Sequence, residues 1–232
     1  MNYEVQNGLY KGIFLKENKK KYFNHSSKLI GLYEEAVQDA LNKIITENKI
    51  NYFYNIGCCE GYHFIGNIKK NKFIKAYATD IDQSALKVLK KNLILNKIIT
   101  NNIAINNNYD LKAIQGDGIK LHETLFLIDI EGDELAFFNY ENINIYKKSH
   151  FIIEFHYDHI NFFKKLFNSE KEKIFYELIM DNFKVDIIEK KFKTHPLNYL
   201  NNIDVFNEDD KYLLISESAD SKIIWIYLYP KD

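Results

Sequence analysis

The stretch INYFYNIGCCEGY, at residues 50–62, decides the fold. Its first half, residues 50–56, is short, apolar and aromatic, which is typical of a buried strand. Gly57 and Gly61 follow, and glycine lets a backbone turn tightly where other residues are strained. The next helix is therefore expected to begin near Gly61. A buried strand, a glycine turn and a helix in this order indicate the first unit of an α/β domain.

Strands and helices continue to alternate after this stretch. FIKAYAT at residues 73–79 predicts a second strand, and Asp82 is expected to cap the helix that follows. Trp225, the single tryptophan, lies in the last apolar strand and is expected in the core. Further strands are predicted within residues 99–110 and at 111–115, 125–130, 151–155, 183–189 and 223–229, with helices at 134–140, 160–167 and 170–182. The alternation predicts an open α/β domain with a mostly parallel sheet flanked by helices.

The chain upstream of the first strand is expected to be an addition to this domain. Residues 1–25 are polar and mixed, and apolar residues recur every three to four positions from Ser26 to Ile45, which predicts a helix. No repeat and no Pro- or Gly-rich linker divides the sequence. We expect an N-terminal extension and helix over residues 1–48 and the α/β domain over residues 49–232, as one compact unit.

The composition excludes several classes of protein. All 31 positive residues are lysine and face 32 acidic ones, so the net charge of -1 gives no electrostatic reason to bind nucleic acid. No apolar run approaches the roughly 20 residues of a membrane span, and the N-terminus lacks the apolar part of a signal peptide. The two cysteines, Cys58 and Cys59, are adjacent, which favours a reducing compartment. We expect a soluble cytoplasmic protein.

Polar residues follow the predicted strands at their carboxyl ends, where open α/β sheets bind ligands. Asp80 ends the second strand 19 residues after Gly61, a place where an acid can accept hydrogen bonds from both hydroxyls of a ribose. Asp117, beside Gly118, either meets an adenine amino group or is an ordinary turn residue. Polar residues of this kind at the carboxyl ends of strands indicate a nucleotide-like cofactor, although the three-glycine dinucleotide fingerprint is absent.

Four segments together resemble the FkbM family of S-adenosylmethionine-dependent methyltransferases. They are YNIGCCEGY at 54–62, ATDIDQSALKVLKKN at 78–92, LIDIEGDEL at 127–135 and FIIEFH at 151–156. The family typically has an acid-glycine first loop, an acid after the second strand, a D-x-E-G-x-E segment and an E-x-H strand. The resemblance runs from about Tyr52 to His156 and implies a class I methyltransferase-like, Rossmann-like fold that binds S-adenosylmethionine.

The resemblance also implies a cofactor site, residue by residue. The methionine part would lie in the first loop, which comprises residues 55–61. The ribose would lie on Asp80, the adenine on Ile81 and near Asp117, and the sulfonium beside Asp129. The residues so assigned are Asn55, Gly57, Cys58, Glu60, Gly61, Asp80, Ile81, Asp117, Gly118 and Asp129. One of them departs from the family pattern, because Asn55 stands where the first-loop acid is expected. Its amide oxygen accepts a hydrogen bond but carries no charge for the ammonium group of the cofactor.

Methyl transfer from a sulfonium is an in-line displacement, so the enzyme aligns the acceptor and manages its proton. The candidate bases lie at the ends of neighbouring strands: Asp129, Glu131, Glu134, Glu154 and His156. We prefer His156 because its ordinary pKa is about 6.5, while a histidine with a purely structural role is the alternative. Such a group also suits Mg²⁺ or Mn²⁺, although no strict ligand spacing predicts a metal.

The resemblance implies an O-methyltransferase for a hydroxyl of a saccharide or nucleotide-activated sugar, in surface or capsular polysaccharide biosynthesis. Without arginine, a diphosphate-sugar would have to face lysines, either Lys19, Lys20 and Lys21 or Lys190, Lys191 and Lys193. Two other classes stay open: a nicotinamide-dependent oxidoreductase, which the incomplete glycine fingerprint disfavours, and a catalytically silent homologue that binds a partner, which Asn55 keeps open. The sequence does not indicate an oligomeric state.

Overall fold

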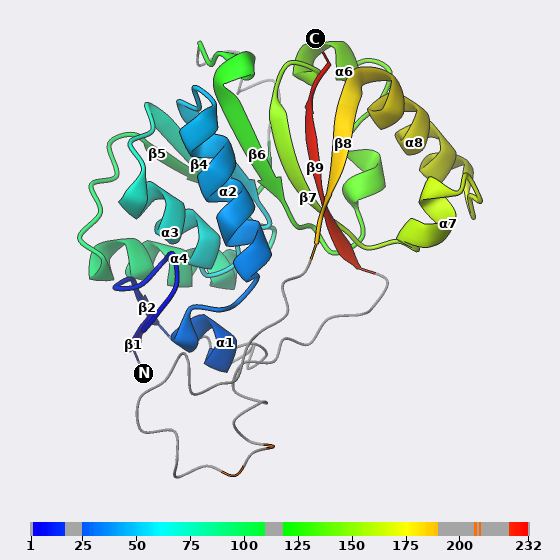
Figure 1. The fold of residues 1–232 in the computed structure, drawn as a ribbon. Coiled ribbons are helices and arrows are strands. Elements are labelled where there is room, and N and C mark those ends of the chain that lie inside the picture. Colours follow the sequence, from blue (N-terminus) through cyan, green and yellow to red (C-terminus); the bar gives the residue numbers. More distant parts are fainter. Residues whose placement is uncertain are drawn as a thin grey trace.

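The computed structural model describes residues 2–16, 25–109, 118–189, 207, 209 and 223–231. It confirms the predicted α/β architecture (Figure 1). A seven-stranded sheet has the order β5-β4-β3-β6-β7-β9-β8. Its strands are β3 (Tyr52–Ile56), β4 (Lys75–Thr79), β5 (Ile103–Asn106), β6 (Thr124–Ile128), β7 (His150–Phe155), β8 (Phe183–Ile188) and β9 (Ile224–Pro230).

The sheet is parallel from β5 to β7 and antiparallel at one edge. β3 pairs in parallel with β4 and with β6, whereas β9 runs antiparallel to both β7 and β8. The chain moves outward from β3 to β4 and β5 and then returns to β6 on the other side of β3. The order of the strands therefore reverses between β3 and β6, which is where sheets of this type bind ligands.

Helices cover both faces of the sheet, as the predicted pattern requires. They are α2 (Glu35–Glu47), α3 (Tyr62–Lys70), α4 (Gln83–Leu95), α6 (Ile143–Tyr146), α7 (His159–Phe163) and α8 (Glu170–Asn182), with single turns η1 (Leu121–Glu123) and η2 (Glu134–Ala136). One core cluster joins α2, α3 and α4 to one face, and a second joins η2, α6, α7 and α8 to the other. β3 is buried at all five positions, which explains its continuous apolar sequence.

The N-terminal part differs from the prediction in two ways. Residues 2–16 contain a short hairpin of β1 (Asn2–Glu4) and β2 (Phe14–Lys16), which the polar sequence did not indicate. The predicted helix is divided into α1 (His25–Ile30) and α2, because Gly31 takes a left-handed φ of 90°. A Cβ atom on Gly31 would lie 1.9 Å from the carbonyl oxygen of Asn7, so this glycine lets the hairpin and the helix pair approach each other closely.

Downstream of β4 most predicted elements are present: α8 has the predicted bounds, whereas β6, α7 and β8 are shorter than predicted. The expected strand within residues 99–110 is β5, and the helix expected at 134–140 is reduced to the single turn η2. The predicted strand at 111–115 lies outside the described residues. Trp225 is buried, as expected from its apolar strand. Among the helices of the described residues, none combines the length and apolar composition that crossing a bilayer requires.

Candidate functional site

The glycine turn after β3 is held at the point where the sheet order reverses. Gly57 has a φ of 78°, and a Cβ atom on it would lie 1.6 Å from the carbonyl oxygen of Asp129. The backbone N–H groups of Gly57 and Cys58 both donate to the carbonyl oxygen of Thr79, at 2.8 and 2.9 Å. The turn is therefore fixed between the ends of β4 and β6, and only glycine fits at position 57.

The second predicted glycine begins the next helix. Gly61 is the N-cap of α3 with a φ of 92°, and a Cβ atom there would lie 2.3 Å from Cδ1 of Leu89 on α4. The prediction that α3 begins near Gly61 is confirmed. Gly61 thus allows the first loop and α4 to approach each other closely.

The carboxylate of Asp80 connects two strand ends. Its oxygens accept hydrogen bonds from the backbone N–H groups of Cys59, at 2.7 Å, and Asp82, at 2.8 Å. Asp82 caps α4 by accepting from the N–H of Ser84 at 2.7 Å, as predicted. Ile81, between the two acids, leaves 89% of its side chain exposed. The exposed side chain of Ile81 therefore lies next to this anchored carboxylate, and its contact with an adenine stays a prediction.

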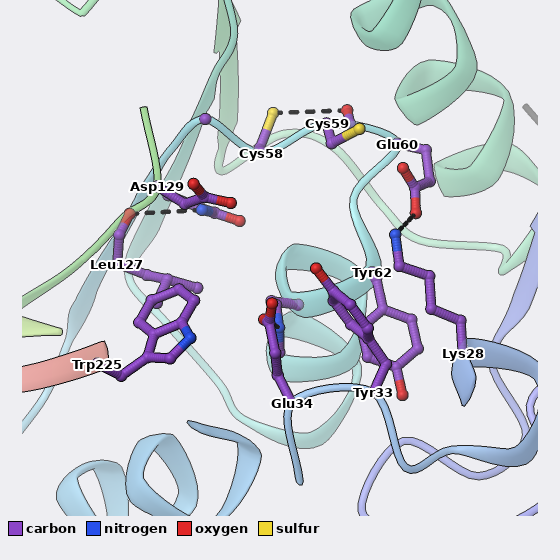
Figure 2. A pocket seen from close by; sticks show the side chains of 13 residues that line it. Lys28, Tyr33, Glu34, Cys58, Cys59, Glu60, Tyr62, Leu127, Asp129 and Trp225 are labelled. Atoms are coloured by element: carbon purple, nitrogen blue, oxygen red, sulfur yellow. Dashed lines mark hydrogen bonds and ion pairs between the residues drawn. The ribbon is translucent and has the colours of Figure 1, made fainter. Parts of the chain in front are cut away.

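A pocket opens between the strand ends and the turn that joins α1 to α2 (Figure 2). Five of its lining residues were predicted from the sequence: Asn55, Gly57, Cys58, Glu60 and Asp129. Others were not, and they are Lys28, Tyr33, Glu34, Cys59, Tyr62, His63, Leu127 and Trp225. Four predicted cofactor residues, Gly61, Asp80, Ile81 and Gly118, do not line this pocket, and Asp117 lies outside the described residues.

Lys28 and Glu60 form a buried ion pair at one side of the pocket, with Nζ and Oε1 2.5 Å apart (Figure 2). Burial alone would raise the pKa of Glu60, but the charge of Lys28 and the hydrogen bonds that the carboxylate accepts together outweigh it and hold that pKa at about 2. The same pairing raises the pKa of Lys28 although burial opposes it. Lys28 comes from α1, so the pair joins the N-terminal addition to the first loop.

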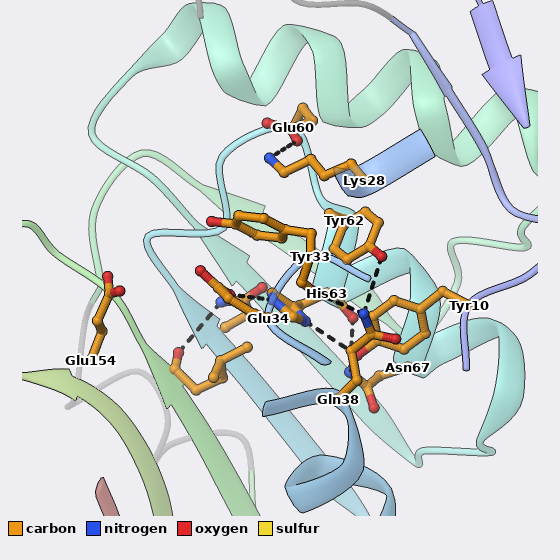
Figure 3. A network of polar contacts seen from close by, with 12 residues as sticks. Tyr10, Lys28, Tyr33, Glu34, Gln38, Glu60, Tyr62, His63, Asn67 and Glu154 are labelled. Carbon is orange, nitrogen blue, oxygen red and sulfur yellow. Dashed lines mark hydrogen bonds and ion pairs between the residues drawn. The ribbon is translucent and has the colours of Figure 1, made fainter. Parts of the chain in front are cut away.

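The N-terminal addition also contributes a carboxylate to the pocket, that of Glu34 (Figure 3). Its Oε2 lies 2.6 Å from Nε2 of His63, and Nδ1 of the same ring lies 3.3 Å from the hydroxyl of Tyr10. The backbone of Glu34 has a left-handed φ of 47°. Gln38 steadies this turn because its amide donates to the carbonyl oxygen of Tyr33 at 2.7 Å.

No sequence signal marked Glu34 as a residue of the site. It belongs to the turn that Gly31 opens, and the sequence pattern predicted one uninterrupted helix there. A glycine inside the amphipathic pattern, just before two consecutive acids, was the only local hint.

His156 is the centre of a cluster of acids at the ends of β6 and β7. Its Nδ1 lies 2.9 Å from Oε1 of Glu134, and its Nε2 lies 3.3 Å from Oε2 of Glu154 and 3.6 Å from Oε2 of Glu131. Glu134 is fully buried, and its Oε1 also accepts from the N–H groups of Ile130, at 3.3 Å, and Gly132, at 3.1 Å. The sequence predicted these residues as neighbours, and the structure brings them together.

Two groups of this cluster, His156 and Asp129, hold their protons more tightly than usual. Burial lowers the pKa of His156, but hydrogen bonds and charges from Glu134 and Glu154 raise it to about 11. Burial, followed by the neighbouring carboxylate of Glu154, raises the pKa of Asp129 well above its usual range. His156 is therefore cationic at neutral pH, and a cationic imidazole has no lone pair for another proton. The role of His156 as general base stays a prediction that requires its proton to leave first.

No protein-family model and no curated protein matches the sequence. Solved structures do resemble the fold. A putative methyltransferase, yhhF, from Escherichia coli has a TM-score of 0.50 at 10% identity, over 100% of each chain. Precorrin-6y C5,15-methyltransferase from Geobacter metallireducens GS-15 has a TM-score of 0.50 at 11% identity, over 93% of this chain and 94% of that one. The fold is the Rossmann-like fold of class I methyltransferases.

Proposed function

We propose that this chain is an S-adenosylmethionine-dependent O-methyltransferase. The observation that carries the proposal is the contact of Gly57 with the backbone of Asp129, where the sheet order reverses. It leaves a pocket bounded by the glycine turn on one side and by an acid at the end of β6 on the other. A donor held in that turn would direct its sulfonium toward Asp129, beside the cluster of acids and histidine.

The predicted cofactor residues fit this placement in two groups. Asn55, Gly57, Cys58 and Glu60 line the pocket and, with Gly61 at the start of α3, would surround the methionine part. Asp80, Ile81, Asp117 and Gly118 would serve the nucleoside part. The carboxylate of Asp80 already accepts two N–H groups, and its remaining lone pairs are available to ribose hydroxyls.

Glu34 supplies the charge that Asn55 lacks. S-adenosylmethionine carries an ammonium group at its methionine end, and a carboxylate binds such a group more strongly than an amide does. Glu34 and Asn55 line the same pocket, and Figure 2 shows the side chain of Glu34 directed into it. The acid expected in the first loop is thus provided by the turn between α1 and α2.

The chemistry needs alignment and a path for one proton. The acceptor oxygen attacks the methyl carbon, the sulfur–carbon bond breaks with its electron pair on sulfur, and the hydroxyl proton leaves. Holding donor and acceptor in line accounts for roughly 7–11 kcal/mol of such barriers. Asp129, Glu131 and Glu154 are the carboxylates that we propose to receive the proton, and His156 takes part only after its own proton has left.

The acceptor we propose is a hydroxyl of a saccharide or a nucleotide-activated sugar, as the sequence resemblance implies. The acids at the ends of β6 and β7 suit a polyhydroxylated, uncharged surface, because carboxylates accept hydrogen bonds from several hydroxyls. The lysines expected to face a diphosphate, Lys19 to Lys21 and Lys190, Lys191 and Lys193, lie outside the described residues.

Calorimetry tests the donor. We expect S-adenosylmethionine and S-adenosylhomocysteine to bind with one site per chain and NAD not to bind. Binding of NAD alone would replace the proposal with an oxidoreductase, and binding of neither would indicate a silent homologue.

A methyl-transfer assay tests the acceptor. The labelled methyl group should appear on a nucleotide-activated sugar or saccharide, with no incorporation into RNA supplied at the same concentration. Labelling of RNA instead would contradict the proposed acceptor while leaving the donor assignment intact.

A further inference from the structure

Three ligand-bearing side chains converge next to the proposed reaction centre. Asp129 follows β6, while Glu154 and His156 lie at the end of β7. One carboxylate oxygen from each acid and one ring nitrogen of His156 all lie within 4.8 Å of one another. Two ligands bound to one cation at about 2.1–2.4 Å are separated by at most about 4.8 Å, so the three atoms need at most small side-chain movements to share one ion.

One carboxylate oxygen of Asp129 lacks a hydrogen-bond partner in this cluster. Its Oδ1 is completely buried and has no hydrogen-bond partner among the residues that the structure describes. A buried carboxylate oxygen without a partner costs free energy that a bound cation would recover. The carbonyl group of the same residue packs against Gly57, so the backbone of Asp129 is held next to the glycine turn after β3.

The ring of His156 is held as a metal ligand usually is. Its Nδ1 lies 2.9 Å from the carboxylate of Glu134, which is fully buried and fixed by backbone N–H groups. Histidines that bind metals typically donate the other ring N–H to a carboxylate, which sets the orientation of the ring. The Nε2 atom then faces Glu154, at 3.3 Å, and a cation bound there would displace the proton that this nitrogen carries in the free protein.

We propose that Asp129, Glu154 and His156 bind one divalent cation of the Mn²⁺ or Mg²⁺ type. Two carboxylates and one imidazole are oxygen-rich but not purely oxygen, a set that suits Mn²⁺ best of the hard cations. Two carboxylate charges balance the charge of the ion, and Glu131, 3.6 Å from Nε2 of His156, adds a further negative charge at the rim. Three protein ligands leave coordination positions open for an acceptor.

The use of this cation rests on the proposed methyltransferase function, whereas its binding does not. A sugar hydroxyl bound to the cation becomes more acidic, because a divalent ion stabilises the alkoxide. Its proton passes to the exposed carboxylate of Glu131 and then to water. The alkoxide oxygen forms the new bond to the methyl carbon, and S-adenosylhomocysteine leaves with the electron pair of the broken bond. A role for the cation would also explain why His156 lies among three acids.

Titration with Mn²⁺ followed by electron paramagnetic resonance tests the site on the full chain, with donor and acceptor both omitted. Protein first treated with a chelator should remove one equivalent of Mn²⁺ from the free-ion signal. Glu154→Gln and Asp129→Asn should each weaken binding by about tenfold or more, and Glu134→Gln should weaken it by roughly 10–100-fold through the orientation of His156. Glu141→Gln, which removes one exposed carboxylate elsewhere, should leave it unchanged.

Two readouts separate the possible failures. Each variant is checked for binding of S-adenosylhomocysteine and for cooperative thermal unfolding, and Glu154→Gln should pass both because it removes a carboxylate from a crowded group of acids. No stoichiometric Mn²⁺ in the wild-type protein, or equal Mn²⁺ affinity in Glu154→Gln, would overturn the metal site and identify the cluster as a structural ion pair. If the wild-type protein does not bind S-adenosylhomocysteine, that result would instead count against the methyltransferase proposal.

Discussion

Position 57 shows how a single residue fixes the site. A side chain there would meet the carbonyl oxygen of Asp129 at 1.6 Å, and the backbone is left-handed. We expect Gly57→Ala to lower the free energy of unfolding by clearly more than the roughly 1–2 kcal/mol that a left-handed alanine costs by itself. Gly12→Ala is the matched control, because Gly12 has a φ of 84° with no atom within 4 Å of the added Cβ. Equal losses in chemical denaturation would show that the contact with Asp129 is unimportant.

The prediction for Glu34 concerns the point at which this chain departs from the FkbM pattern, namely the origin of the acid that would bind the ammonium group of the donor. Glu34→Gln should weaken binding of S-adenosylmethionine by about tenfold or more, since hydrogen bonds to charged groups contribute about 1.5–3 kcal/mol. Glu35→Gln removes the next acid along α2, which does not line the pocket, and should leave the affinity unchanged. Calorimetry measures both.

A charge exchange sharpens the same prediction. Asn55→Asp places a carboxylate in the first loop, so the double variant Glu34→Gln/Asn55→Asp should recover part of the donor affinity that Glu34→Gln loses. If the single variant at Glu34 binds the donor normally, the first loop meets the ammonium group without help from the N-terminal addition.

Asp80 and Asp82, at the start of α4, are expected to have different roles: Asp82 stabilises the helix, and Asp80 binds the donor. Asp82 was correctly predicted as the cap, and Asp82→Ala should cost about 0.5–2 kcal/mol of stability with little change in donor affinity. Asp80→Ala should weaken donor binding, because it removes the proposed ribose ligand and the anchor of Cys59. Denaturation and calorimetry on both variants check the division. A donor affinity that is unchanged in Asp80→Ala would exclude the ribose role.

The pair of Lys28 and Glu60 links α1 to the first loop and predicts a pH dependence. The pKa of Glu60 is about 2 in the folded state and near 4.5 in the unfolded chain, so its stabilising effect is fully present above pH 4.5. It is lost as the pH falls toward 2, because the unfolded state then binds a proton that the folded state resists. Denaturation measured between pH 7 and pH 3 should show this loss, and Glu60→Gln should lack that component.

Breaking the same pair at neutral pH should be costly. Lys28→Met leaves Glu60 buried without its cation, and we expect a loss of about 3–5 kcal/mol. The double variant Lys28→Met/Glu60→Gln should recover much of it, since no charge then remains buried. Additive losses in the double variant would mean that the two side chains do not stabilise the protein as a pair.

The elements that the sequence predicted are those whose pattern is local. The buried run of β3, the glycine turn and the capped helix α4 each depend on neighbouring residues, and all three are present. The hairpin of β1 and β2 was missed because its strands have three residues each and depend on distant partners. The backbone of Phe14 bonds to the side chain of Asn96 in both directions, at 2.9 and 2.6 Å, a contact that no local pattern can reveal.

The site was predictable to the same extent. Gly57 and Asp129 follow neighbouring strands, so their meeting follows from the strand order. Lys28, Tyr33 and Glu34 reach the pocket only because the chain bends at Gly31. The high pKa of His156 likewise depends on how closely Glu134 and Glu154 approach it in space, and its sequence neighbours alone do not determine that approach.

At the scale of the whole molecule, residues 1–48 and 49–232 should behave as one unit. The ring of Tyr10 is buried against α3, where a Cβ atom on Gly66 would lie 2.4 Å from it, and the hairpin shares its core cluster with α2, α3 and α4. We therefore expect calorimetry of the full chain to show a single cooperative transition, in which donor binding and the N-terminal addition are lost together. A fragment of residues 49–232 should expose the apolar face of α3 and lose cooperative unfolding. A folded fragment that still binds S-adenosylhomocysteine would show that the addition only covers the site, and the role proposed for Glu34 would fall with it.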